Sequence, residues 1–193
     1  MIVDALVEGL IDEAVARRII VSSGHNFGIC YGKKGIGYIQ QKIQKFNASA
    51  PRGVMLTLVD FMDTRLGCPP EVLCNWLPQR HPNMIFRVVV REIESWLLAD
   101  CDNFADFLHV PKNRIPTNPE QLNDPKQTVV NLARHSRSKH IRDALIPGCA
   151  TSAPVGTLYT SEMISFIQTR WDVRVARRNA PSLNRCMNQL EGS

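Results

Sequence analysis

The chain has 193 residues, which is enough to bury a hydrophobic core within one domain. With 44% apolar and 21% charged residues, it has the composition of a globular protein, which argues against wholesale disorder. The formal net charge of +5 permits a polyanionic partner without requiring one. We expect a cytoplasmic protein with no membrane association, because no apolar run has the roughly 18 residues of a membrane span and the N-terminal "MIVDALVEG" lacks the basic start of a secretory signal.

The N-terminal part alternates between strand-like and helix-like segments. "IVDALVE" (residues 2–8) is rich in Val, Ile and Leu and predicts a strand that ends near Glu8. "IDEAVARRII" (11–20) carries its apolar residues at helical spacing. "VSSGHNFGICYG" (21–32) predicts a second strand, and "GIGYIQQKIQKF" (35–46) predicts a second helix.

Two further strands are nearly continuous apolar runs. "GVMLTLVD" (53–60) and "MIFRVVV" (84–90) predict strands inside a sheet that is covered on both faces. A helix is expected to follow over residues 93–108. This alternation predicts an α/β fold with a mainly parallel central sheet flanked by helices.

The C-terminal third begins with a connector rich in Pro and Asn, "PKNRIPTNPEQLNDPKQ". Helices are expected after it, near residues 125–145, 160–170 and 181–190. Asp124 is suited to cap the first of these, with Pro125 at its first helical position. We interpret the chain as a single domain (1–193), in which the α/β core spans 1–110 and the connector and helical C-terminal extension span 111–193.

Acidic residues follow three of the predicted strands. Glu8 follows the first strand, Asp60 and Asp63 follow "GVMLTLV", and Glu92 and Glu94 follow "MIFRVVV". The carboxyl ends of parallel strands meet at one edge of a sheet, so these acids are expected to converge there. Clustered carboxylates repel one another unless a cation lies between them. Oxygen ligands alone favour Mg²⁺ or Mn²⁺ over zinc.

Each of these acids also has an ordinary structural interpretation. Asp63 is compatible with a turn in "DFMDTRLG", and either Glu92 or Glu94 with a solvated helix start. Glu8 and Asp60 are harder to explain in this way, because each directly follows a strand of the buried type. The pattern alone leaves structural and functional roles open for both.

The motifs "VEGLIDE" and "LVDFMD" resemble the Toprim signature of topoisomerases, primases and overcoming-lysogenization-defect nucleases. In that signature, a Glu-Gly after the first strand and an Asp-x-Asp after the third build a magnesium site. Over nearly its whole length the chain is similar to the bacterial Toprim-like family labelled domain of unknown function 4276. That likeness is carried by "GIGYIQQKI", the strand end "LVD", "REIESWLLAD" and "NDPKQ".

The resemblance implies particular roles for residues in the first half of the chain. Glu8 matches the glutamate that serves as metal ligand or general base, and Asp60 matches the first aspartate of Asp-x-Asp. Met62 replaces the second aspartate, and the next acid, Asp63, comes one residue later. An offset of one residue re-aims a side chain, so Asp63 is expected either to act as a secondary ligand through water or to make no contact with the metal.

The resemblance also implies two residues in the second half. Glu94 matches the third acid of the family better than Glu92 does. Lys126, in "DPK", matches a lysine that stabilises charge on a phosphate during transfer. An exposed lysine in the first turn of a helix is the ordinary alternative for Lys126.

A nucleic acid would need basic surface near such a site. Candidates are Lys33, Lys34, Arg52 and the segments "RHSRSKHIR" (134–142) and "RWDVRVARR" (170–178). In the last segment, the arginines that flank Trp171 are Arg170, Arg174, Arg177 and Arg178. These side chains can contact phosphate and stack on a base, which favours a nucleic-acid partner. We expect that partner to be DNA rather than RNA. A solvated helix face is the ordinary alternative, and Val173 and Val175 indicate that part of the segment is core.

These features predict a Mg²⁺-dependent nuclease-like phosphoryl-transfer enzyme. The resemblance further implies an ATPase partner of the AAA or SMC-like type and a phage-defence module. The rival hypothesis is a catalytically degenerate Toprim-like module that binds a partner protein or nucleic acid without cleavage. The replacement at Met62 and the modest net charge favour this rival.

Overall fold

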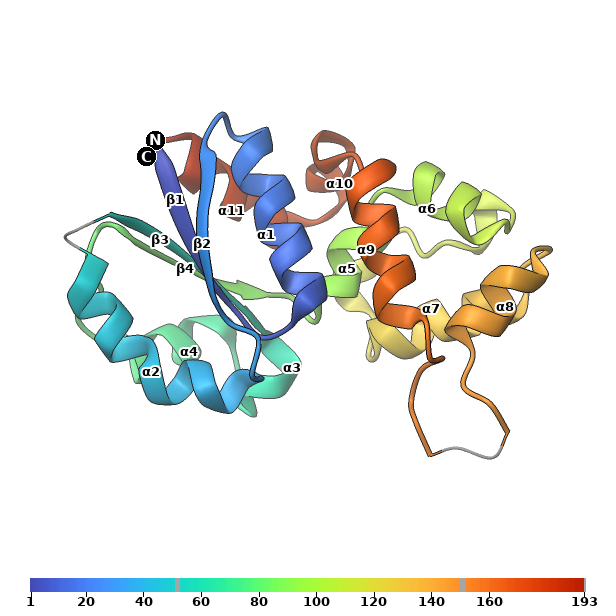
Figure 1. Ribbon diagram of the computed structural model, residues 1–193, viewed down its shortest axis with the longest axis horizontal. Coiled ribbons are helices and arrows are strands. Elements are labelled where there is room, and N and C mark those ends of the chain that lie inside the picture. The colour runs from blue at the N-terminus through green and yellow to red at the C-terminus, as the bar shows by residue number, and fades with distance from the viewer. Residues whose placement is uncertain (51–52, 150–151, 193) are drawn as a thin grey trace. The chain divides into compact units, whose positions relative to one another are not determined.

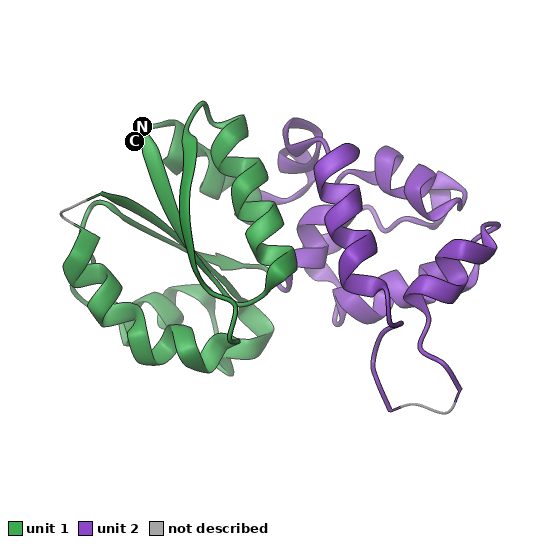
Figure 2. Cartoon of the chain, viewed as in Figure 1, with its two compact units in different colours: residues 1–90, 182–193 green, residues 91–181 purple. Residues whose placement is uncertain are grey.

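The computed structural model describes residues 1–50, 53–149 and 152–192. The chain divides into two compact units, unit 1 (Met1–Val90 with Ser182–Ser193) and unit 2 (Arg91–Pro181), which Figure 2 colours separately. The interpretation of the whole chain as one domain stays a prediction. Among the described residues, no helix combines the length and the apolar character needed to cross a membrane.

Unit 1 is built on a parallel sheet, which confirms the α/β class predicted from the alternating segments. Over the described residues this sheet has four strands in the order β2-β1-β3-β4, and each neighbouring pair is parallel. The strands are β1 (Ile2–Val7), β2 (Asn26–Gly32), β3 (Val54–Asp60) and β4 (Met84–Val89). The helices of this unit are α1 (Leu10–Ser22), α2 (Ile36–Ser49), α3 (Phe61–Thr64), α4 (Pro69–Trp76) and α11 (Pro181–Glu191).

The strand order reverses the direction of the chain between β1 and β3. From β1 the chain moves outward to β2, then crosses back past β1 and continues through β3 to β4. Because crossovers between parallel strands are right-handed, α1 covers one face of the sheet while α2 and α4 cover the other, as Figure 1 shows. The carboxyl edge of the β1–β3 pair is therefore a topological switch point, the place where sites form in open α/β sheets.

Helices cover both faces of the sheet, which explains why its inner strands are apolar nearly throughout. On one face, Leu6 and Val59 belong to a buried cluster with Ile43 of α2. Helix α11 covers β4 on the face that carries α1 (Figure 1), and the Arg87 guanidinium donates a hydrogen bond to the Arg185 carbonyl at 3.0 Å. The predicted helical extension is confirmed, and its last helix returns to unit 1.

Unit 2 is helical in its described residues. Its helices are α5 (Ile93–Leu98), α6 (Cys101–Leu108), α7 (Pro125–Arg134), α8 (Lys139–Leu145), α9 (Tyr159–Thr169) and α10 (Val173–Asn179), with 3-10 turns at Lys112–Arg114 and Pro119–Gln121. The predicted cap is confirmed, because Oδ1 of Asp124 accepts the backbone N–H of Gln127 at 2.7 Å and Pro125 lies in the first turn.

Two long predicted helices are each divided in the structure. The helix expected over 93–108 is interrupted at Asp100, which is buried and accepts the backbone N–H of Asp172 at 2.7 Å. The helix expected over 125–145 is also interrupted, because Ser138 caps a new helix. Helices α3, α4 and α10 were not predicted, since each is too short to show a clear helical period.

Two glycines allow a matched test of the backbone. Gly32 has φ +91° and a Cβ there would lie 2.2 Å from the Val7 carbonyl oxygen, whereas Gly37 lies inside α2 with open space around it. We expect Gly32→Ala to lower the free energy of unfolding by about 2 kcal/mol or more. Gly37→Ala should raise it by about 0.5–1 kcal/mol. Urea denaturation measures both, and equal effects of the two substitutions would contradict the close approach of Gly32, the last residue of β2, to Val7.

Candidate functional site

The structure brings Glu8 and Asp60 together at the topological switch point. Glu8 directly follows β1, Asp60 ends β3, and these strands are neighbours in the sheet. The Glu8 carboxylate accepts the backbone N–H of Asp60 through Oε1 at 2.7 Å. Asp60 is only 7% exposed, so its carboxylate is held in the protein rather than in solvent. This pair is the part of the predicted ligand set that unit 1 supplies.

A third acid, Asp12, belongs to the first turn of α1 and is buried. Its Oδ2 lies 3.2 Å from the position that a Cβ at Gly9 would take. An acid in the first turn of a helix is ordinarily a solvent-exposed charge that complements the helix dipole. The burial of Asp12, which no spacing rule predicts, makes it a further candidate at the carboxyl edge of the sheet.

The loop after β2 is tied to the same edge. The backbone N–H of Gly35 donates to the Glu8 carbonyl at 3.0 Å, and the Lys33 ammonium pairs with Glu13 at 3.1 Å. Lys33 and Lys34 are both exposed. The two lysines therefore flank the end of β1, where they can contact an anionic substrate that lies near Glu8 and Asp60.

The structure places Asp63 and Met62 differently from Asp60. Both lie on the short helix α3 and are exposed, with 38% exposure for Met62. The chain turns into this helix directly after Asp60, so the two residues leave the line of β3. Asp63 remains a candidate for a secondary contact through water.

Unit 2 contains a second cluster, in which Lys126 lies between two glutamates. Oε1 of Glu92 accepts from the Lys126 ammonium at 3.2 Å, and Oε2 of Glu92 accepts the Lys126 backbone N–H at 3.1 Å. The same ammonium lies 3.9 Å from Oε1 of Glu94. Tyr159 of α9 donates its hydroxyl to that oxygen at 3.0 Å. The sequence did not identify Tyr159 as a site residue, because no recognisable motif surrounds it.

Burial dominates the electrostatics of Glu94. Its side chain is 0% exposed, and burial raises its pKa to about 7, while Lys126 acts in the opposite direction. Burial, together with the nearby Glu94, also raises the pKa of Tyr159 well above its ordinary value. Oε2 of Glu94 is buried without a hydrogen-bond partner among the described residues. A carboxyl group in this state exchanges its proton near neutral pH.

The basic segment at 170–178 is divided between core and surface. Trp171 is 0% exposed, and its indole N–H donates to the Trp96 carbonyl at 3.2 Å, so its ring is not presented to a base. The expected stacking role is corrected in this respect: Trp171 anchors the chain in the core just before α10. The flanking arginines Arg170, Arg174 and Arg178 are exposed, and Arg177 is partly exposed. Arg52 lies outside the described residues.

The described residues contain no group of three or more His, Cys, Asp or Glu side chains that could hold a metal ion. Glu8 and Asp60 belong to unit 1, whereas Glu94 belongs to unit 2. The joint ligand set of these three acids therefore stays a prediction. The carboxylate oxygens that each unit supplies are of the type that Mg²⁺ and Mn²⁺ prefer.

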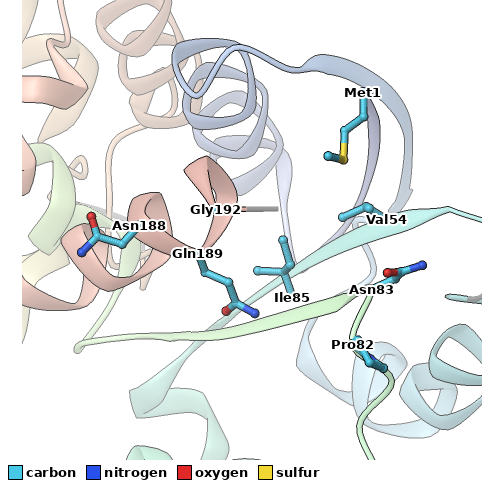
Figure 3. Close-up of a pocket in the computed structure, with 8 residues that line it drawn as sticks. All are labelled: Met1, Val54, Pro82, Asn83, Ile85, Asn188, Gln189 and Gly192. Carbon is cyan, nitrogen blue, oxygen red and sulfur yellow. The ribbon is translucent and has the colours of Figure 1, made fainter.

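A pocket of about 470 Å³ lies elsewhere in unit 1 (Figure 3). Met1, Val54 and Asn83 line it, and they lie at or just before the starts of β1, β3 and β4. Because these strands are parallel, the pocket is at the edge opposite to Glu8 and Asp60. Its lining side chains carry no charge, and they include Gln189 and Asn188 of α11.

Comparisons with known proteins give one match. A family model with the description "Domain of unknown function (DUF4276)" matches residues 4–191, which is nearly the entire chain. No curated protein matches the chain, and no solved structure does.

The raised pKa of Glu94 makes stability depend on pH. The folded protein binds this proton with a pKa of about 7, against an ordinary value of 4.5, so the contribution is complete below about pH 4.5 and is lost as the pH rises to 7. We expect Glu94→Gln to remove this dependence, which amounts to about 3 kcal/mol at most. Urea denaturation from pH 4.5 to 8 in EDTA measures the difference. Parallel pH profiles for wild type and variant would contradict the assignment.

Proposed function

The chain belongs to the family described as a domain of unknown function, DUF4276, and we propose that it is a metal-dependent phosphoryl-transfer enzyme that cleaves nucleic-acid phosphodiesters. The observation that carries this proposal is the meeting of Glu8 and Asp60 where two neighbouring parallel strands end, with 2.7 Å between Oε1 of Glu8 and the Asp60 backbone nitrogen. Carboxylates at a switch point are suited to hold Mg²⁺ or Mn²⁺ beside a substrate in the crevice.

The proposed roles follow from the environment of each side chain. Glu8 is partly exposed and can accept a proton from an attacking water, while the buried Asp60 is a ligand. Glu94 is proposed as the third ligand and Asp63 as a contact through water. Lys126 is the proposed phosphate contact. When bound, Mg²⁺ would polarise the phosphodiester and stabilise the leaving oxygen.

The proposed substrate is DNA rather than RNA, held through its backbone phosphates. The exposed Lys33 and Lys34 beside the end of β1, and the exposed arginines at 170–178, supply the positive charge. The resemblance to Toprim domains supports the nuclease assignment and adds two elements: an ATPase partner of the AAA or SMC-like type, and a cytoplasmic phage-defence module.

A second candidate is a degenerate module that binds without cleavage. Met62 stands in the place of the second aspartate and is exposed on α3. In addition, a backbone N–H occupies one oxygen of Glu8, and the Lys126 ammonium forms ion pairs with Glu92 and Glu94. These contacts are the ones expected of acids that have become structural.

Plasmid nicking separates the two candidates. With Mn²⁺ or Mg²⁺, we expect wild type to nick a supercoiled plasmid, and Glu8→Gln and Asp60→Asn to lose at least about 100-fold in rate, since each removes a charged ligand. Glu71→Gln, which changes an exposed acid of α4, is the matched control and should keep the wild-type rate. DNA binding without nicking by wild type would support the degenerate module. Equal rates in wild type and Glu8→Gln would exclude the proposed site.

The two loop lysines make a separate prediction. Lys33→Ala/Lys34→Ala should weaken DNA binding for all sequences alike, because phosphate contacts carry no base information. The slope of log K against log salt should fall by up to about 2. Fluorescence anisotropy at several salt concentrations measures this, with Lys112→Ala, an exposed lysine paired with Asp102, as the control. An unchanged slope would place the DNA contact elsewhere.

A further inference from the structure

One ammonium group and two carboxylates meet in unit 2. The Lys126 ammonium is 3.2 Å from Oε1 of Glu92 and 3.9 Å from Oε1 of Glu94. The glutamates are two residues apart, at the start of α5, and Lys126 lies in the first turn of α7. The positive charge therefore stands between two negative charges that would otherwise repel each other.

This cluster differs from an ordinary surface ion pair. The side chain of Glu94 is 0% exposed, and its Oε2 has no hydrogen-bond partner among the described residues. Buried polar atoms are almost always hydrogen-bonded, so an unsatisfied carboxylate oxygen in a group that faces Lys126 indicates a missing partner. Oxygen atoms of two carboxylates, one of them unsatisfied, are the ligands of a divalent cation that keeps several of its waters.

Lys126 is held in a way that lets its ammonium leave. Its backbone N–H donates to Oε2 of Glu92, and Asp124 caps α7, so the start of the helix is fixed independently of the lysine side chain. The side chain itself is 36% exposed. It can rotate toward solvent without unfolding α7.

We propose that Lys126 is a built-in competitor of divalent metal: its ammonium closes the Glu92–Glu94 pair, and a metal ion that binds the pair displaces it. The displaced ammonium is then available to an anionic group such as a phosphate. This inference rests on the proposed function, from which it takes the class of cation, a divalent metal. It adds Glu92 as a ligand, and it adds an order of events in which metal binding releases the Lys126 ammonium.

Metal binding to the full chain tests this competition. Calorimetric titration with Mn²⁺ at pH 8 should show at least about tenfold tighter binding for Lys126→Met than for wild type, because the competing charge is gone. Lys126→Arg should stay near wild type. Lys112→Met removes an exposed lysine of the same unit and is the matched control. Unchanged or weaker binding by Lys126→Met would overturn the proposal, as would a gain that survives in Lys126→Met/Glu92→Gln.

A second measurement uses wild type and does not depend on the folding of a variant. Acylation of lysines, followed by mass spectrometry, should modify Lys126 several-fold faster in Mn²⁺ than in EDTA, while Lys112 reacts equally in both. An unchanged rate for Lys126 would overturn the proposal. Failure of this inference can be distinguished from failure of the proposed function, because the proposed function is tested separately by plasmid nicking. The Mn²⁺ gain of Lys126→Met should persist in Lys126→Met/Glu8→Gln, whether or not wild type cleaves DNA.

Discussion

The hydrogen bond from the Asp60 backbone to the Glu8 carboxylate joins the ends of two neighbouring parallel strands, and the arrangement of the site in unit 1 depends on that pairing. Residues 8–53 separate β1 from β3 in the sequence, yet the two strands are adjacent in the sheet, because the chain crosses back after β2. The crossover sends α1 to one face and α2 to the other, which opens the carboxyl edge between them. The loop with Lys33 and Lys34 reaches this edge through the Gly35–Glu8 backbone hydrogen bond.

Charge compensation is the second constraint, and the two units meet it differently. In unit 1 the Glu8 carboxylate accepts the backbone N–H of Asp60, which is a neutral dipole. In unit 2 the buried Glu94 has a tyrosine hydroxyl on one oxygen and the Lys126 ammonium nearby. An isolated carboxylate at 0% exposure would be costly, so a proton, the lysine or a metal ion must accompany it. That requirement connects the shifted pKa of Glu94 with the proposed competition between lysine and metal.

The strands and the first helices were predictable because their signals are local. The apolar runs at 53–60 and 84–90 correspond to β3 (Val54–Asp60) and β4 (Met84–Val89), and the cap at Asp124 is present as expected. The divided helices were not predictable, since the interruption at Asp100 serves a hydrogen bond to Asp172, far along the chain. Trp171 shows the same limit: arginines surround it in sequence, but its indole is buried against Trp96.

The sequence by itself determined the alternation of strands and helices, the parallel sheet and the acids that follow its strands, because periodicity and strand-end chemistry are properties of short segments. Only the tertiary structure decided which acids share an environment. Strand order pairs Glu8 with Asp60, and packing of α5, α7 and α9 surrounds Glu94 with Lys126 and Tyr159. Burial of a carboxyl group, and with it the pKa near 7, arises from side chains distant in sequence, and no local pattern encodes it.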